Sequence, residues 1–247
     1  MNKTVEILEV PISKVTMNEA VDIVDGFIKS NTFHAVYTPN PEIVMLAKKN
    51  DDFMEVIKKA DMVVPDGIGV VIASKLQKGE KLPERVAGYD LVQNTMKRAT
   101  KEGYKYYFFG SKPGVADKAA AKMRETYPGI QIVGTRDGYF KKEDEAEIVK
   151  DINDSGANIL LVALGAPKQE MWIETHRDAL PNVRVAIGVG GSLDGMAGIV
   201  KRAPLIYQKL GLEWFYRLLK QPSRFGRMLV LPQFLIEVLL NKAKGKR

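Results

Sequence analysis

The chain has 247 residues, of which 45% are hydrophobic and 27% charged, a composition that suits one large α/β domain with an appendage. It contains no cysteine, which excludes disulfides and thiolate metal sites, and its two histidines are too few for a histidine-rich metal centre. The net charge of +7 is concentrated at one end, because residues 201–247 hold eleven Lys and Arg against two Glu, a charge of +9 that leaves −2 for the rest. That segment is expected to meet an anionic partner.

The first residues, MNKTVEILEV, contain no apolar run of the signal-peptide kind. No stretch approaches the roughly 20 apolar residues that a membrane-spanning helix needs. We therefore expect a protein of the cytoplasm or of a cytoplasmic surface.

Short apolar strands alternate with helical patterns over residues 1–200. The predicted strands are Val5–Val10, His34–Thr38, Asp61–Pro65, Lys105–Gly110, Ile130–Thr135, Asn158–Leu164 and Arg184–Val189. Helix starts lie between them: Thr16 with Glu19 forms a capping box, Asn40 and Pro41 read as N-cap and first helical residue, and further helices run from Pro113 and over 142–153. This alternation predicts a Rossmann-like, mostly parallel sheet with helices on both faces.

Polar, glycine-rich loops follow five of the predicted strands. They are Tyr37–Glu42, Pro65–Gly69, Gly110–Gly114, Gly165–Glu170 and Gly188–Gly195. Because ligands of such sheets collect at the carboxyl ends of the strands, the clustering predicts an active site at this edge.

Asp66 is the candidate catalytic residue, since it follows a strand directly and precedes a glycine. It would accept a proton from a substrate hydroxyl as a general base, or it would cap the helix that begins near Ile68. Residue spacing alone leaves both interpretations open.

The glycine turns are candidates for a phosphate or nucleotide cradle, with Gly110 in one and Gly190 and Gly191 in the other. Neither turn carries a dinucleotide or P-loop fingerprint, and plain tight turns are the alternative. Asp194 would accept hydrogen bonds from a sugar hydroxyl or satisfy its own turn.

Four polar side chains near these loops are candidates for substrate binding. Thr38 and Asn40 would bond a sugar or cap a helix, and the amide of Gln169 suits sugar hydroxyls. Arg85 would contact a phosphate or the acceptor, or lie solvated in its loop. The acidic pairs 51–52 and 143–144 occur at helix starts rather than at strand ends, so we expect no metal in the site.

The C-terminal segment combines basic and apolar helical faces. Lys209, Glu213, Arg217 and Lys220 share one face, and Trp214 and Leu218 lie on another. A second helical pattern follows Pro222, with Arg224 and Arg227 on it. This pattern is typical of helices that lie in an anionic membrane interface. Packing on the core or on another subunit is the alternative, and the oligomeric state stays open.

The ordered motifs across about residues 10–200 resemble one family. They are Thr38-Pro-Asn-Pro-Glu42, Pro65-Asp-Gly-x-Gly69, Arg85-Val-x-Gly88, Phe109-Gly-Ser-x-Pro-Gly114, Gly165-x-Pro-x-Gln-Glu170 and Gly188-Val-Gly-Gly191. The sequence is similar to the WecG/TagA/CpsF glycosyltransferases (glycosyltransferase family 26), most closely to their teichoic-acid branch of N-acetylmannosaminyltransferases from Gram-positive bacteria.

The resemblance implies inverting, metal-independent transfer of N-acetylmannosamine from UDP-ManNAc to the C4 hydroxyl of GlcNAc on undecaprenyl diphosphate, without a cofactor. It also implies a peripheral protein at the inner face of the cell membrane. In this resemblance Asp66 is the general base, and Thr38, Asn40, Arg85 and Gln169 line the pocket. The tail, residues 201–247, would bring Arg217, Arg224 and Arg227 over the catalytic core, residues 1–200.

Other functions are weighed against this one. A related transferase would use UDP-ManNAc-uronate or another UDP-sugar, and residue chemistry does not choose among them. A nucleotide-dependent oxidoreductase is disfavoured by the missing dinucleotide fingerprint. In a nonenzymatic binding module, the leucine and aromatic content of the tail favours lipid over nucleic acid.

Overall fold

A computed structural model of the chain describes residues 3–209, 211–220, 226 and 229–243. Its centre is a six-stranded, wholly parallel sheet with the strand order β4-β3-β8-β7-β5-β6. The strands are β3 (His34–Tyr37), β4 (Met62–Val63), β5 (Lys105–Gly110), β6 (Gln131–Arg136), β7 (Ile159–Ala163) and β8 (Val185–Gly188). Each overlaps its predicted range, and the α/β class with a parallel sheet is confirmed.

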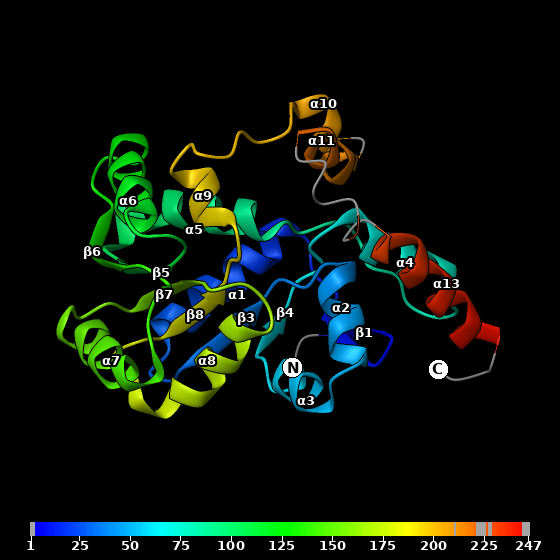
Figure 1. The fold of residues 1–247 in the computed structure, drawn as a ribbon, viewed down its shortest axis with the longest axis horizontal. Helices are drawn as coiled ribbons and strands as arrows, with labels where there is room; N and C mark the ends of the chain where they lie inside the picture. The colour runs from blue at the N-terminus through cyan, green and yellow to red at the C-terminus, as the bar shows by residue number, and fades with distance from the viewer. Residues whose placement is uncertain (1–2, 210, 221–225, 227–228, 244–247) are drawn as a thin grey trace.

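Helices cover both faces of this sheet, as predicted (Figure 1). One face carries α2 (Pro41–Lys48), α3 (Asp51–Lys58), α4 (Ile68–Leu76), α7 (Glu145–Asp154) and α8 (Lys168–His176). The other carries α1 (Met17–Lys29), α5 (Gly88–Glu102), α6 (Val115–Thr126) and α9 (Ser192–Met196). Short 3-10 turns, η1 (Lys142–Asp144) and η2 (Arg177–Ala179), precede α7 and follow α8. Strands β4, β5, β7 and β8 are buried almost throughout between the two layers, which explains their apolar sequences, whereas the edge strand β6 is partly exposed.

The N-terminal segment forms a hairpin rather than the single predicted strand Val5–Val10. Strands β1 (Thr4–Ile7) and β2 (Val10–Ser13) pair antiparallel. The chain reverses at Leu8 and Glu9, whose φ angles are 50° and 71°. Non-glycine residues seldom adopt such angles, so this turn has no sequence signal of the usual kind. Val63 N–H donates to Ser13 Oγ at 3.1 Å, which places the hairpin against edge strand β4.

Two helix starts confirm the local predictions. The Thr16 side chain accepts from Glu19 N–H while the Glu19 carboxylate accepts from Thr16 N–H, so the capping box is complete. Asn40 Oδ1 accepts from Ile43 N–H at 3.0 Å, with Pro41 as the first residue of α2. Asn40 therefore caps its helix.

Beyond residue 200 the described helices are α10 (Leu205–Lys209), α11 (Glu213–Lys220) and α13 (Val230–Ala243). Helix α13 lies beside α4 in Figure 1, and its Phe234 and Val238 are buried in the apolar cluster that includes Val44 of α2. In the part of the chain that the structure describes, no helix combines the length and apolar character needed to cross a membrane. The division into a core of residues 1–200 and an appendage of residues 201–247 stays a prediction.

Candidate active site

The carboxyl edge of the sheet contains a switch in chain direction. Strand β5 leads outward to β6, whereas its neighbour β7 leads the opposite way to β8. Connections that diverge from neighbouring strands leave a crevice at their carboxyl ends, which is where ligands of open parallel sheets bind. The loops after β3, β8, β7 and β5 follow one another along this edge.

Hydrogen bonds join the end of β8 and the segment after it to the segments that follow three other strands. Thr38 Oγ1, after β3, donates to the Gly188 carbonyl at 3.0 Å. Gly190 N–H donates to Oε1 of Gln169, after β7, at 3.0 Å. Ser111 Oγ, after β5, donates to Asp194 Oδ2 at 3.3 Å. These contacts bring the loops of Thr38, Gly110, Gln169, Gly190, Gly191 and Asp194 into one assembly.

The glycines of this assembly differ in the space available for a side chain. Gly110 has a φ of +122°, and a Cβ there would lie 2.5 Å from the Ala163 carbonyl carbon, so the turn requires glycine. Gly190, at φ +50°, and Gly191 have no atom within 4 Å of the position a Cβ would take. The second turn thus exposes its backbone to open space, which leaves room for a ligand.

Asp66 lies at the end of β4, in the connection to α4. Its N–H donates to the Pro39 carbonyl at 3.2 Å, which holds the loop against the turn before α2. The N-cap position of α4 is Gly67, not Asp66. The Asp66 carboxylate is 30% exposed and lies 3.7 Å from Nη2 of Arg85. The geometry therefore presents a partly shielded carboxylate beside a cation.

Arg85 belongs to a chain of charged groups that reaches the C-terminal helices. Its Nη2 also donates to Oε2 of Glu213, the first residue of α11. Glu213 Oε1 in turn accepts from Nε of Arg202 at 3.4 Å. Arg202 makes a bidentate contact with Asp90, at 2.5 and 2.6 Å. Arg85 is therefore neither solvated nor isolated, because carboxylates flank it on two sides.

Gln169 is 2% exposed, and both ends of its amide are engaged. Besides the bond from Gly190, its Nε2 donates to Glu170 Oε1 at 2.8 Å. Burial raises the pKa of the Glu170 carboxyl to about 7, against the smaller opposite effect of the Gln169 hydrogen bond. Glu170 Oε2 is buried without a hydrogen-bond partner. The amide thus shapes the loop after β8.

The structure does not bring the remaining predicted site residues into the hydrogen-bonded assembly of loops. Asn40 uses its side-chain oxygen for the cap of α2, beside the Asp66 loop. Arg217 belongs to α11, and no side-chain position is described for it. Arg224 and Arg227 lie outside the described residues. The sequence analysis named none of Asp90, Ser111, Glu170, Arg202 and Glu213 as site residues, although Ser111 and Glu170 belong to quoted motifs.

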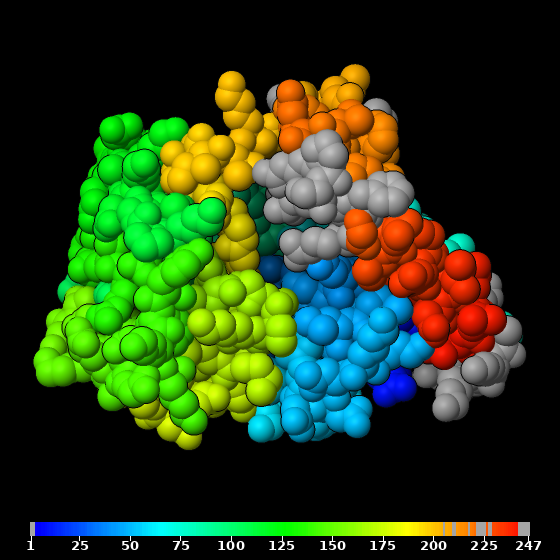
Figure 2. Space-filling view, in the orientation of Figure 1, coloured from blue at the N-terminus to red at the C-terminus, as the bar shows by residue number. Residues whose placement is uncertain are grey.

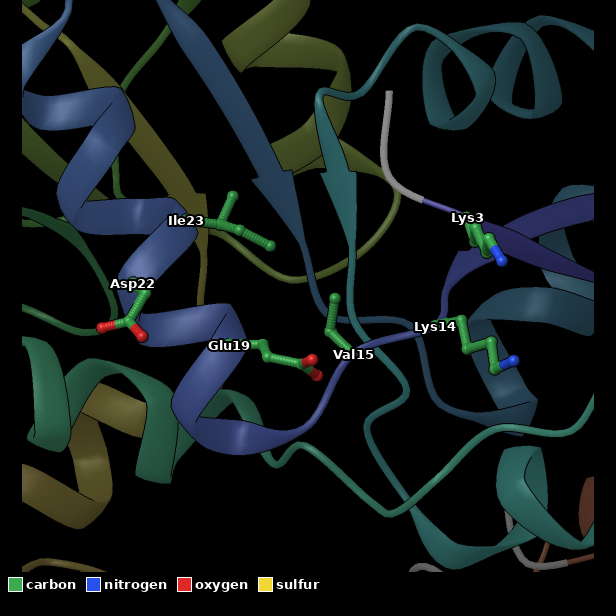
Figure 3. Close-up of a pocket in the computed structure, with 6 residues that line it drawn as sticks. All are labelled: Lys3, Lys14, Val15, Glu19, Asp22 and Ile23. Carbon is green, nitrogen blue, oxygen red and sulfur yellow. The ribbon is translucent and has the colours of Figure 1, made fainter.

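The surface is hollowed between the segment that follows β8, drawn in gold, and the blue helix α2 (Figure 2). A separate pocket of about 360 Å³ lies between the N-terminal hairpin and α1, and Figure 3 shows its lining by Lys3, Lys14, Val15, Glu19, Asp22 and Ile23. There Lys14 pairs with Glu80, Asp22 pairs with Arg98, and the Glu19 carboxylate serves the capping box. We therefore place the candidate site at the strand-end loops rather than in this pocket. Among the described residues no group of three or more His, Asp or Glu side chains is arranged to hold a metal ion.

The chain is similar in sequence to known glycosyltransferases. The family model described as "Glycosyl transferase WecG/TagA/CpsF family" matches residues 5–247. A relative from Bacillus spizizenii, named N-acetylglucosaminyldiphosphoundecaprenol N-acetyl-beta-D-mannosaminyltransferase, is 39% identical over 216 residues, 87% of this chain and 82% of its own length. A relative of the same name from Bacillus subtilis is 35% identical over 245 residues, 99% of this chain and 94% of its own. The chain belongs to the WecG/TagA/CpsF family of glycosyltransferases.

Proposed function

We propose that this protein transfers N-acetylmannosamine from UDP-ManNAc to the C4 hydroxyl of GlcNAc on undecaprenyl diphosphate, the first committed step of wall teichoic acid synthesis. The observation that carries the proposal is the Asp66 carboxylate, held beside Arg85 at an edge where glycine-rich loops converge. The names of the two Bacillus relatives support the sugar and the acceptor.

In the proposed step Asp66 is the general base. It takes the proton of the acceptor C4 hydroxyl as that oxygen attacks the anomeric carbon of the donor. The new glycosidic bond forms as the bond to the UDP oxygen breaks, and UDP departs with the electron pair. Attack from the face opposite UDP inverts the anomeric centre and gives a β-linked disaccharide.

The departing diphosphate needs positive charge and hydrogen-bond donors. Arg85 supports this role because its guanidinium, on a side chain that is 20% exposed, lies beside the Asp66 carboxylate, and arginine forms charge-assisted hydrogen bonds with phosphate oxygens. The backbone at Gly190 and Gly191 borders open space, so a diphosphate can approach it closely. Arginine and backbone donors would thus perform the electrostatic stabilisation that the reaction requires.

The lipid-linked acceptor fits the C-terminal helices. Seven of the twelve large hydrophobic side chains exposed among the described residues belong to this segment: Ile206, Phe215, Leu219, Leu229, Ile236, Leu239 and Leu240. Together with the charge of +9 over residues 201–247, they suit the interface of an anionic membrane. We therefore propose peripheral binding at the inner face of the cell membrane, with Arg217, Arg224 and Arg227 near the lipid diphosphate.

A transfer assay with a GlcNAc-diphospholipid acceptor tests the proposal. UDP-ManNAc should give a disaccharide lipid and free UDP, whereas UDP-GlcNAc should give neither. Transfer from UDP-ManNAc-uronate in place of UDP-ManNAc would reassign the donor. Turnover with none of these donors, at any acceptor concentration, would refute the proposed activity.

A further inference from the structure

Glu213 is a buried carboxylate contributed by the C-terminal segment to the edge of the candidate site. Its side chain is 11% exposed, although it is the first residue of a short helix on the outside of the molecule. Two guanidinium groups hold it, Arg85 through Oε2 and Arg202 through Oε1. A buried charge of this kind persists only where it is paired.

The backbone around Glu213 is also seated against the Asp66 loop. Gly211 has a φ of +70°, and a Cβ there would lie 2.8 Å from Cγ1 of Ile68, the first residue of α4. Ile68 follows Asp66 by two residues. The contact of α11 with the core is therefore made beside the proposed base.

Arg202 fixes the other side of the Glu213 carboxylate. Its two-pronged contact with Asp90 and its position 4.9 Å above the Tyr89 ring anchor it to the start of α5. Burial alone would lower the pKa of Arg202, but Asp90 and Glu213 raise it above its ordinary value. Glu213 thus bridges an anchored arginine and an arginine of the site.

The Glu213 carboxylate affects the position of Arg85. Its Nη2 lies between the Asp66 carboxylate at 3.7 Å and the closer Glu213 carboxylate. Removing Glu213 would leave Asp66 as the described carboxylate nearest to Arg85, and the guanidinium would collapse onto the proposed base. An Asp66 engaged in that way would be a poorer proton acceptor, and Arg85 would turn its donors away from the diphosphate.

We propose that Glu213 is a positioning residue that holds Arg85 at the correct distance from Asp66 and makes catalysis depend on the seating of α11. The inference rests on the transferase activity proposed above. It assigns to the C-terminal segment a role in arranging the site, separate from any contact with lipid.

Steady-state kinetics of the full chain test this role. Glu213→Gln should lower kcat about 10- to 100-fold and change the KM for the UDP-sugar by no more than about threefold, because Asp66 and Arg85 are proposed to act on the attack and on the charge of the departing diphosphate rather than on binding of the donor. Glu213→Asp, which keeps the charge, should recover part of the loss. The matched control is Glu237→Gln, which breaks another ion pair between the C-terminal segment and the core, with Lys48 of α2, and should leave kcat within about twofold.

A double-mutant cycle separates action through Arg85 from a general effect on stability. If Glu213 acts through Arg85, then Arg85→Ala with Glu213→Ala should be no slower than Arg85→Ala alone. Additive losses in the cycle, or a Glu213→Gln enzyme as fast as the wild type, would overturn the inference. A faster Glu213→Gln enzyme with a lower KM for the acceptor would also overturn it, by showing that the carboxylate competes with the diphosphate.

Hydrogen exchange provides a readout that does not depend on turnover. Both Arg85→Ala and Glu213→Gln should speed exchange of backbone amides in 211–220 by about tenfold or more, and Glu237→Gln should not. Coupled exchange in a protein without transferase activity would refute the proposed function but leave the contact standing. Transferase activity in the wild-type protein, together with unchanged exchange in both variants, would refute the role of Glu213 and leave the proposed function standing.

Discussion

Gln169 and Glu170 form a hydrogen bond between neighbouring side chains, from Nε2 to Oε1 at 2.8 Å, and both side chains are almost completely buried. The same amide accepts from Gly190 N–H at 3.0 Å. Gly190 and Glu170 together fix which way the amide faces, since a flipped amide would direct its NH2 group at the Gly190 N–H and its oxygen at Oε1 of Glu170. Through this orientation a buried acid shapes the loop proposed to bind the diphosphate.

Glu170 predicts a specific dependence of stability on pH. Its pKa is about 7 in the folded chain against an ordinary value of 4.5, so the folded state retains a proton that the unfolded state loses. The free energy of unfolding should fall as the pH rises between about 4.5 and 7, by up to about 3 kcal/mol, and this contribution should be constant at higher pH. Glu170→Gln, which stays neutral, should lack that slope in urea unfolding.

Glu143, an exposed carboxylate in η1, supplies the control. Glu143→Gln should keep the wild-type dependence on pH. If Glu170→Gln keeps it as well, the buried acid does not hold a proton at neutral pH.

Asp66→Ala should abolish transfer while preserving donor binding. Loss of a general base typically lowers kcat by about 10²- to 10⁴-fold. The affinity for UDP, measured by calorimetry, should stay within about threefold, because the carboxylate acts on the acceptor hydroxyl. Asp178→Ala, at an exposed position of η2, should retain full activity. Full turnover by Asp66→Ala would show that another group removes the proton.

The strand-end loops were predictable from the sequence because their signals are local. Apolar runs fixed the six parallel strands to within one or two residues, and Asn40 with Pro41 marked the start of α2. The hairpin turn at Leu8 and Glu9 was not predictable, because these residue types usually avoid positive φ.

The ion pair between Arg85 and Glu213 was not predictable from the sequence. Arg85 and Glu213 are 128 positions apart, and no periodicity relates them. In the sequence Glu213 is one of two acidic residues in a basic segment, which suggests a solvated charge. Only the return of α11 to the Asp66 loop makes it part of the candidate site.

Substitutions at two glycines of the strand-end loops should have different effects on stability. Gly110→Ala places a Cβ 2.5 Å from backbone atoms of Ala163 at a φ of +122°, so it should destabilise the protein by about 3 kcal/mol or more. Gly191 has a φ of −74° and open space around the position of its Cβ, so Gly191→Ala should change stability by less than about 0.5 kcal/mol.

The same Gly191→Ala variant should weaken UDP binding by about tenfold if the diphosphate approaches this backbone. Thermal unfolding and calorimetry on one preparation measure both quantities. Unchanged UDP affinity in a stable Gly191→Ala protein would move the diphosphate away from the loop after β8.

The exposed apolar side chains of the C-terminal helices should carry membrane binding. Leu219 and Ile236 are 58% and 56% exposed, so replacing both with Glu removes little packing and should leave the unfolding temperature within a few degrees. It should nevertheless reduce cosedimentation with phosphatidylglycerol vesicles by about tenfold or more. The substitutions remove apolar contact and add negative charge, which the anionic vesicle surface repels. Tyr139→Glu is the matched control, since Tyr139 is 69% exposed but lies between β6 and η1, outside the C-terminal segment. Undiminished vesicle binding by the double variant, or equal loss in Tyr139→Glu, would show that these helices face something other than lipid.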